Sequence, residues 1–313
     1  MPVVVTELRE EHLPATTELF AERYAAALDR HPLLDRDADV AAAVAAVRVS
    51  STHGWVALDG ERVVGYLISR VDENATWADL GGYAAIDERT TRLLYAEAST
   101  TWVAEGGLRH AVVLLVGDEA AEDAWSRLGF GQEHVIALAP VEPSRTTPPA
   151  DVDVRIATSD SDLASLLDMC LIVDRHLALA PAWSYRSPEF AATLPGMFRE
   201  DFAKPEVLDF IASIGGVDVG FASWAPMPRR IGVPETTVAF DHAAVRPEYR
   251  GRGVGAMLDT VGRAWAIEQG HTVSWSDWRL ANLAAEPHWR TLGWTPYATR
   301  WTRQLAPEVR RQL

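Results

Sequence analysis

Apolar and polar positions along the chain form two similar series of elements. Each series opens with a short apolar strand, PVVVTEL at 2–8 and DVRIA at 153–157, which leads into a long amphipathic helix. Each then has a hairpin, WVALDGERVVGYLIS at 55–69 and FIASIGGVDVGFAS at 210–223, with an Asp-Gly or a Gly-Gly turn. A helix, a strand, a short helix and a last strand complete each series. The pattern predicts an α+β protein built from two similar units.

Individual positions in the two series also correspond. The turn glycines Gly60 and Gly215 precede the strand glycines Gly65 and Gly220 by the same number of residues. Five later positions share one spacing: Asp118, Ala121, Trp125, Gly129 and Phe130 in the first series, and Asn282, Ala285, Trp289, Gly293 and Trp294 in the second. Such a match indicates an internal duplication. We therefore predict two tandem domains, each a mixed, mostly antiparallel sheet flanked by helices.

A proline-rich segment separates the two series. The sequence APVEPSRTTPPAD at 139–151 contains four prolines and has no apolar periodicity. Proline interrupts both helices and strands, so this composition is typical of a linker. The predicted domains are residues 1–138 and 152–313, with 139–151 between them.

One stretch of the second series suggests a binding site for an anion. In VRPEYRGRGVGAML at 245–258, the glycines Gly251, Gly253 and Gly255 alternate with other residues just before a predicted helix, which we expect to start at Ala256. Glycine lets the backbone curl around a phosphate, and a helix N-terminus presents unpaired N–H groups. A nicotinamide-dinucleotide fingerprint is the alternative. It is disfavoured because RPEYR separates the strand from the first glycine and Glu268 lies within a helix.

Charge and composition exclude several classes of function. The net charge of −15 argues against a nucleic-acid partner. Residues 1–138 hold 23 acidic and 11 basic side chains (net −12), whereas the remainder holds 21 and 18 (net −3), so an anion is better suited to the second half. No apolar run is long enough to cross a membrane, and no secretory signal is apparent. With the single cysteine, Cys170, these features predict a cytoplasmic protein without a membrane partner.

The motifs of the second series resemble those of a known family. Arg250-x-x-Gly253-x-Gly255, between a strand and a helix, resembles the acyl-CoA pyrophosphate loop of the GNAT superfamily of N-acetyltransferases. The positions Asn282, Ala285, Trp289, Gly293 and Trp294 resemble that family's next motif, N-x-x-A-x-x-x-Y-x-x-x-G-F. Both motifs lie within residues 153–305, whereas residues 3–138 share the order of elements and the second motif only. The tandem layout is similar to that of mycothiol synthase and other double-GNAT proteins.

The resemblance implies a set of residues that bind the cosubstrate acetyl-CoA, and no metal. Backbone N–H groups of the loop would cradle the pyrophosphate, the strand before it would pair with the pantetheine arm, and Asn282 would hydrogen-bond that arm. The implied residues are Ala244, Val245, Arg250, Gly251, Arg252, Gly253, Val254, Gly255, Ala256 and Asn282. In the first series, DERTTR at 87–92 takes the place of the loop. Its carboxylates would repel a phosphate, so we predict that the first domain binds no acyl-CoA.

The implied reaction is direct transfer of an acetyl group to the amine of a small molecule in a ternary complex. Asp241 or His242 is the candidate base, and strand alternation predicts that they face opposite sides of the sheet. Asp277 is a weaker third candidate. Trp289 replaces the tyrosine that usually serves as the acid, so either Tyr297 acts instead or the thiolate leaves unassisted.

The acceptor site is expected from two segments. One is the aromatic stretch 174–202, which contains Trp183, Tyr185, Phe190, Phe198 and Phe202, and the other is the loop WAPMPRRIGVPE at 224–235. A protein or peptide amine as acceptor, and a non-catalytic acyl-CoA sensor, remain alternatives. The sequence indicates no oligomeric state.

Overall fold

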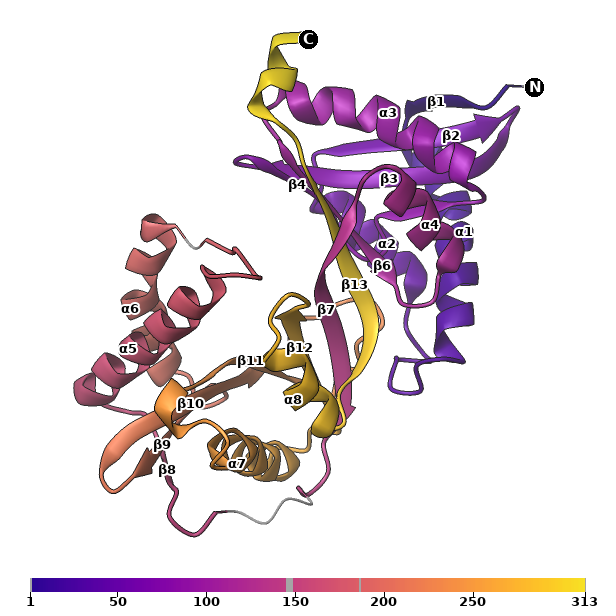
Figure 1. Cartoon of the computed structure of the whole chain (residues 1–313). Coiled ribbons are helices and arrows are strands. Elements are labelled where there is room, and N and C mark those ends of the chain that lie inside the picture. The colour runs from indigo at the N-terminus through magenta and orange to yellow at the C-terminus, as the bar shows by residue number, and fades with distance from the viewer. Residues whose placement is uncertain (1, 145–148, 186, 313) are drawn as a thin grey trace. The chain divides into compact units, whose positions relative to one another are not determined.

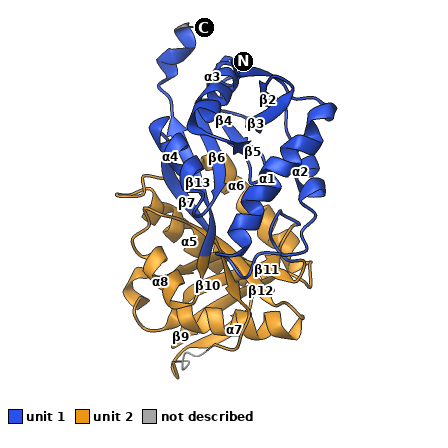
Figure 2. Ribbon diagram, turned by 90° about the vertical axis from the view of Figure 1, so that its right-hand side faces the viewer, with its two compact units in different colours: residues 1–136, 229–234, 296–313 blue, residues 137–228, 235–295 orange. Residues whose placement is uncertain are grey.

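The computed structural model describes residues 2–144, 149–185 and 187–312 (Figure 1). The chain divides into two compact units (Figure 2). Unit 1 comprises Met1–Ile136, Arg229–Pro234 and Pro296–Leu313, and unit 2 comprises Ala137–Pro228 and Glu235–Thr295. Both combine a mixed sheet with flanking helices, which confirms the predicted α+β class.

Unit 1 contains most of the first series. Its elements are β1 (Val4–Glu7), η1 (Glu10–His12), α1 (Leu13–Leu28), α2 (Val40–Val49), β2 (His53–Asp59), β3 (Arg62–Asp72), β4 (Ala75–Ala78), β5 (Tyr83–Ala85), α3 (Glu88–Ala104), β6 (Arg109–Leu115), α4 (Glu119–Arg127) and the first part of β7 (Gly131–Pro140). Its strands follow the order β1-β2-β3-β4-β6, and β5 also pairs with β3. All of these pairs are antiparallel except β4 with β6.

Aromatic side chains form the core between α3 and the sheet of unit 1. A Cβ on Gly65 of β3 would lie 2.7 Å from Thr90 Cγ2 and 3.1 Å from Leu94 Cδ1, so the helix packs directly on the strand there. The large core side chains include Trp55, Tyr95, Trp102, Trp125 and Phe130. This close packing explains why the first hairpin needs a glycine inside a strand.

Unit 2 repeats this arrangement. Its elements are β8 (Asp153–Ile156), α5 (Asp160–Leu177), α6 (Pro188–Phe202), β9 (Leu208–Ile214), β10 (Val217–Pro226), β11 (Thr237–Val245), η2 (Pro247–Tyr249), α7 (Val254–Glu268), β12 (Val273–Arg279) and α8 (Ala285–Thr291). The strand order is β8-β9-β10-β11-β12, and only β11 and β12 run parallel. Gly220 of β10 faces α7, since its Cβ would lie 2.9 Å from Val254 Cγ1. Phe221, the next residue, packs with side chains of α5 and α6 on the other face.

The predicted correspondence between the two motifs extends to backbone geometry. Gly129 after α4 and Gly293 after α8 both have left-handed backbones, with φ of 82° and 86°. The residue after each glycine donates its N–H to the carbonyl oxygen of the motif tryptophan. The distance from Phe130 N to Trp125 O is 3.2 Å, and the distance from Trp294 N to Trp289 O is 3.1 Å. Both short helices therefore end in the same way.

Part of the last strand of each series belongs to the other unit, which was not predicted from the sequence. β13 (Thr295–Gln304) joins the sheet of unit 1, where Ala298–Gln304 pair antiparallel with Arg109–Leu115 of β6. The end of β7 belongs to unit 2, where Ser274 Oγ donates to Ala139 O at 3.2 Å. The compact units therefore differ from the predicted ranges 1–138 and 152–313. The expected linker 139–151 begins within β7, and its residues 145–148 lie outside the described residues.

Candidate active site

The two parallel strands of unit 2 stay paired over only a short stretch. The register joins Thr237–Ala239 of β11 to Val273–Trp275 of β12, and no register pair of the described residues continues it. β11 runs on to Val245, and its other edge stays paired with β10 as far as Val245 opposite Gly220. The predicted cofactor residues Ala244 and Val245 therefore lie where the strand has separated from β12.

The glycine loop connects this strand to α7. Gly251 and Gly253 have φ of 76° and 80°, a left-handed conformation that most other residues avoid. Gly253 is the N-cap of α7 and provides no side-chain cap, so the first N–H groups of the helix have no side-chain acceptor there. The helix begins at Val254, two residues before the predicted start. Its open N-terminus has the polarity that attracts an anion.

Gly255 is needed for a different reason, the close approach of α8. A Cβ at this position would lie 3.2 Å from His288 Cε1. Burial lowers the pKa of His288, although the nearby Asp259 acts in the opposite direction. The His288 imidazole therefore packs against the first turn of α7.

Two exposed arginines flank the loop. Arg250 Nε donates to Val245 O at 3.2 Å. Arg252 forms an ion pair with Asp151 at 2.5 Å, and its guanidinium lies 5.6 Å from the ring centroid of Tyr249. Both side chains can reorient toward solvent because they are exposed. Positive charge is thus available beside the helix N-terminus.

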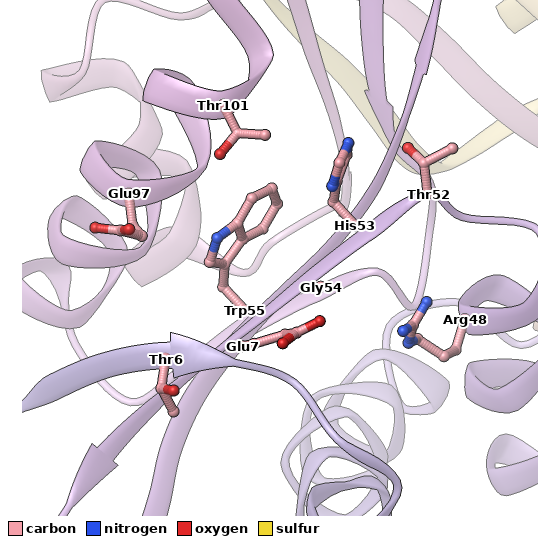
Figure 3. A pocket seen from close by; sticks show the side chains of 9 residues that line it. All are labelled: Thr6, Glu7, Arg48, Thr52, His53, Gly54, Trp55, Glu97 and Thr101. Atoms are coloured by element: carbon pink, nitrogen blue, oxygen red, sulfur yellow. The ribbon is translucent and has the colours of Figure 1, made fainter. Parts of the chain in front are cut away.

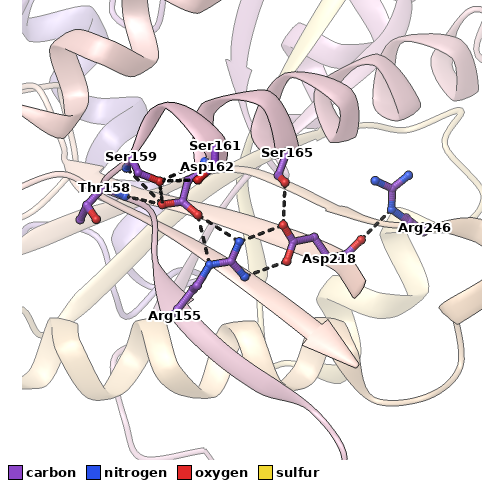
Figure 4. Close-up of polar contacts among 8 residues, drawn as sticks. All are labelled: Arg155, Thr158, Ser159, Ser161, Asp162, Ser165, Asp218 and Arg246. Atoms are coloured by element: carbon purple, nitrogen blue, oxygen red, sulfur yellow. Dashed lines mark hydrogen bonds and ion pairs between the residues drawn. The ribbon is translucent and has the colours of Figure 1, made fainter. Parts of the chain in front are cut away.

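A polar network fastens the end of β11 just before the loop (Figure 4). Arg246 donates to Asp218 O at 2.7 Å and pairs with Asp168 at 2.6 Å. The Asp218 carboxylate accepts from Arg155 at 2.7 Å and from Ser165 Oγ at 2.6 Å, and the hydrogen bonds from Arg155 lower the pKa of Asp218. Arg246 could not be predicted from the sequence, because only the fold brings these residues together.

Asp241 and His242 lie side by side rather than on opposite faces of the sheet. His242 Nδ1 is 2.8 Å from Asp241 Oδ2. Phe240 and His242 pair with the consecutive residues Trp224 and Ser223 of β10, so Asp241 is the extra residue of a β-bulge. A bulge interrupts strand alternation, which is why the predicted orientation does not apply here.

Two further polar residues continue this cluster across the sheet. Asp209 of β9 is paired with Ser223 of β10, which is paired with His242 of β11. Ser223 Oγ donates to the Asp209 carboxylate. Asp209 is only 3% exposed. Burial raises the pKa of Asp209 to about 6. Neither residue was predicted from the sequence, although an aspartate in the apolar strand LDFIASI is a signal for a buried polar site.

The residues of the second motif serve different roles. Asn282, before α8, shares a hydrogen bond of 3.0 Å between its Oδ1 and His176 Nε2. Trp289 is buried among aromatic rings, with centroid distances of 5.0 Å to Phe240 and 5.4 Å to Trp294. Tyr297 is 3% exposed and belongs to unit 1, so the structure does not group it with the residues of unit 2.

The segments expected to form the acceptor site belong to different units. Trp183 and Tyr185 are 72% and 76% exposed in unit 2, whereas Phe198 is buried against α5. Residues 229–234 of the second segment belong to unit 1, where Gly232 O accepts from Asp35 N at 3.1 Å.

A separate pocket of about 290 Å³ lies in unit 1 (Figure 3). It is lined by Thr6, Glu7, Arg48, Thr52, His53, Gly54, Trp55, Glu97 and Thr101. The rim is polar, and His53 is held by Glu105 through a contact of 2.8 Å. None of the predicted site residues lines this pocket.

The described residues contain neither a candidate membrane span nor a candidate metal site. No helix in this part of the chain has the length and apolarity needed to span a bilayer. The same residues contain no group of three or more His, Cys, Asp or Glu side chains arranged to hold a metal ion.

The divergent strands and the glycine loop lie in a part of the chain that matches a known family. The model of the acetyltransferase (GNAT) family matches residues 175–294, which include β11, the loop, α7 and α8. This part of the chain is therefore similar to the GNAT acetyltransferases, a family that transfers an acyl group from acyl-CoA to an amine. No curated protein sequence matches the chain.

Solved structures show that the tandem form of this fold extends over the whole chain. A tandem GNAT protein from the clavulanic acid biosynthesis pathway matches with a TM-score of 0.58 and 14% identity, over 98% of this chain and 99% of its own. A GCN5-related N-acetyltransferase from Sphaerobacter thermophilus matches with a TM-score of 0.62 and 13% identity, over 97% and 96%. A glucosamine N-acetyltransferase region of a fungal multi-domain β-N-acetylglucosaminidase has a TM-score of 0.60 at 12% identity, covering 96% of this chain and 38% of that one. At these identities the similarity is one of fold.

Proposed function

We propose that unit 2 transfers an acetyl group from acetyl-CoA directly to the amine of a small molecule, in a ternary complex. The observation that carries the proposal is the open N-terminus of α7, which follows Gly253 and lies next in the chain to a strand separated from β12. Unpaired helix N–H groups bind phosphate oxygens, and an unpaired strand edge binds an extended amide chain. Acetyl-CoA offers both, as a pyrophosphate and a pantetheine arm.

The loop residues 250–256 would bind the pyrophosphate through backbone N–H groups, with the side chains of Arg250 and Arg252 alongside. Ala244 and Val245 would pair with the pantetheine arm, and a backbone N–H near Val245 would stabilise the negative charge that develops on the thioester oxygen. Asn282 would donate its side-chain amide to the same arm. Its Oδ1 already has partners in His176 and Ala284 N, which support an orientation with the amide group available.

His242 is the better candidate for the base, with Asp241 orienting it. A neutral imidazole accepts a proton near neutral pH, and a carboxylate on its other nitrogen stabilises the imidazolium that forms. The 2.8 Å contact between Asp241 and His242 Nδ1 supports this division of roles. The amine nitrogen then bonds to the acetyl carbon, the C–S bond breaks, and the amine proton passes to the imidazole.

The CoA sulfur leaves either as a thiol, protonated by an acid, or as the free thiolate without assistance. Tyr297 is the candidate acid, but its burial within unit 1 favours a packing role, and a thiolate is a good leaving group without assistance. We expect Tyr297→Phe to change kcat by less than about threefold. A fall of about a hundredfold, the range of general acid catalysis, would assign Tyr297 as the acid.

Unit 1 is proposed to bind no acyl-CoA. Asp87 is the N-cap of α3, and its carboxylate accepts from Thr90 N at 2.7 Å. The N–H groups that would bind a phosphate are thus already engaged by an anion of the chain itself.

Two measurements test the proposed function. A thermal shift with acetyl-CoA, CoA and NAD should show stabilisation by the first two only, by about 2.7 kcal/mol at a ligand concentration of 100 times Kd. A panel of small amines should then release CoA thiol in the presence of acetyl-CoA. Tight CoA binding with no thiol release from any small amine or peptide would favour a non-catalytic sensor, and release with peptides alone would point to a protein acceptor.

A further inference from the structure

We propose that Asp209, held by Ser223, is a positioning residue for His242, whose protonated form it favours from within the sheet. The inference rests on the proposed function, because it assigns a second carboxylate to the base of that reaction. It goes beyond the Asp241–His242 pair by placing the support two strands away, on β9.

The sheet register aligns the three residues on one face. Asp209, Ser223 and His242 are direct neighbours across β9, β10 and β11, so their side chains project from the same side. Adjacent strands are about 4.8 Å apart, so the carboxylate and the imidazole are about 10 Å apart with Ser223 between them. The same face carries Phe221 and Ile211, which pack with α5 and α6, so the carboxylate has apolar neighbours.

Asp209 and His242 interact through their charges. The charge of His242 lowers the pKa of Asp209, although burial dominates and raises it overall. Coupling between two sites is reciprocal, so an ionised Asp209 must in turn favour the protonated imidazole. The effect is strengthened by burial, since little water screens the charge of a side chain that is 3% exposed.

Other charged groups near Asp209 are few and come from two elements. Asp241 on β11 and Asp201 on α6 both raise the pKa of Asp209, and Asp201 is itself paired with Lys204 at 3.0 Å. On β10 the contact is the Ser223 hydroxyl. Just after β8 it is the backbone, where Ala157 N donates to Asp209 O at 2.8 Å. His242 is the cationic partner in this set.

The other unit lacks every member of the cluster. Aligning Gly65 with Gly220 places Gly54 and Ile68, which pair directly, at the positions of Asp209 and Ser223. Ile68 N donates to Gly82 O at 2.7 Å, which places Gly82 at the position of His242. The fold therefore forms without these polar groups. Their presence in unit 2, which also has the open helix N-terminus, indicates a role in the reaction.

In the proposed reaction the proton leaves the amine as its nitrogen bonds to the acetyl carbon, and the electron pair of the broken C–S bond stays on sulfur. The imidazole of His242 takes the proton and becomes cationic. Asp241 holds Nδ1, while Asp209 stays ionised and stabilises the new charge without contacting the substrate.

The test is a titration of the His242 imidazole by NMR, in the whole protein and in Asp209→Asn, with the signal assigned from His242→Gln. Asparagine keeps the shape and can still accept from Ser223, but it carries no charge. We expect the midpoint of His242 to fall by about half a pH unit. Asp201→Asn is the matched control: it removes a carboxylate that is already paired with Lys204, and the midpoint should move by much less. An unchanged midpoint in Asp209→Asn, or equal shifts in both variants, would overturn the inference.

The acid limb of kcat/KM should move in parallel, by about half a pH unit to lower pH in Asp209→Asn. If the wild type releases no thiol with any amine, the proposed function fails, and the NMR titration still decides whether Asp209 acts on His242. If the wild type is active and Asp209→Asn has the same pH profile, only the inference fails.

Ser223→Ala is a second variant in case Asp209→Asn does not fold. It removes the donor that keeps the carboxylate ionised, so the His242 midpoint should fall in the same direction, and no change would contradict the proposal.

Discussion

Each unit places a helix at the corresponding point of its own sheet, α3 in unit 1 and α7 in unit 2. The N-termini of these two helices differ in whether a side chain caps them. In unit 1 the Asp87 carboxylate accepts from Thr90 N, and these hydrogen bonds lower the pKa of Asp87 and keep it ionised. In unit 2 the equivalent helix starts after Gly253, with no side-chain cap. The two units therefore share this layout but differ in a single capping side chain, which is the basis of the proposal that only unit 2 binds the pyrophosphate.

The middle of the sheet shows a second difference. Where unit 2 has Asp241 and His242, unit 1 has Gly81 and Gly82, and the carbonyl oxygen of Gly81 accepts from Tyr66 OH at 2.7 Å. A Cβ on Gly81 would lie 3.4 Å from Ile231 Cδ1, so the chain segment 229–234 covers this position in unit 1. Two polar side chains in unit 2 thus correspond to two tightly packed glycines in unit 1.

The largest expected effect comes from giving unit 2 the charge found in unit 1. Gly253→Asp should weaken CoA binding at least about a hundredfold, because a carboxylate would face the pyrophosphate at the start of α7. Isothermal titration calorimetry measures the affinity, and circular dichroism checks the fold. The matched control is Gly253→Asn, which has the same shape and tolerates a left-handed backbone but lacks the charge. It should retain more affinity than the aspartate variant.

Retained affinity in Gly253→Asp would contradict the assignment of the loop. The same calorimetry reports the number of sites, for which we expect one CoA per chain. A value of two would show that the capped helix of unit 1 also binds the cofactor.

The second effect concerns the stability of the buried carboxylate. The pKa of Asp209 is about 6 in the folded chain, above its usual 3.8, so its contribution to stability is complete below pH 3.8 and is lost as the pH rises through 6. Asp209→Asn carries no such penalty at neutral pH. The difference in unfolding free energy, variant minus wild type, should therefore rise by up to about 3 kcal/mol from pH 4 to pH 7.5.

Urea denaturation at the two pH values measures this difference. Relative to the wild type, Asp209→Asn should be more stable at pH 7.5 than at pH 4. If its His242 midpoint is lowered at the same time, the effect on His242 is not a loss of stability. A constant difference between variant and wild type at both pH values would mean that burial does not raise the pKa of Asp209 as described.

The smallest expected effect is in unit 1. Asp87→Ala removes the cap of α3 and should destabilise the protein by about 1 kcal/mol, without changing CoA affinity at unit 2. Asp87→Asn should restore most of the loss, because asparagine also caps helices. A weaker CoA affinity in Asp87→Ala would be at odds with the separation of roles between the units.

Local patterns in the sequence were sufficient for much of this fold. The hairpins follow from turn glycines between alternating residues, and the duplication follows from the spacing of Trp125 with Gly129 and of Trp289 with Gly293. The loop residues 250–256 could be singled out because glycines with φ near +80° have few substitutes. The roles assigned to these residues in binding acetyl-CoA stay predictions.

Other features depend on contacts between distant parts of the chain. The β-bulge at Asp241 arises from pairing with β10. The polar contacts of Arg246 need Asp218 and Asp168 from two other elements. The loop 224–235 looked suited to an acceptor site. However, the structure buries its apolar residues Ile231 and Val233, and residues 229–234 belong to unit 1.

The position of β13 has a practical consequence for anyone who divides this chain. A fragment that stops near residue 140 would lack the strand that pairs with Arg109–Leu115, leaving the backbone N–H and C=O groups along that side of β6 without partners. Exposed edges of this kind recruit other chains, so such a fragment should aggregate when expressed alone. A peptide spanning 295–313, added in trans, is the natural reagent to keep it in solution.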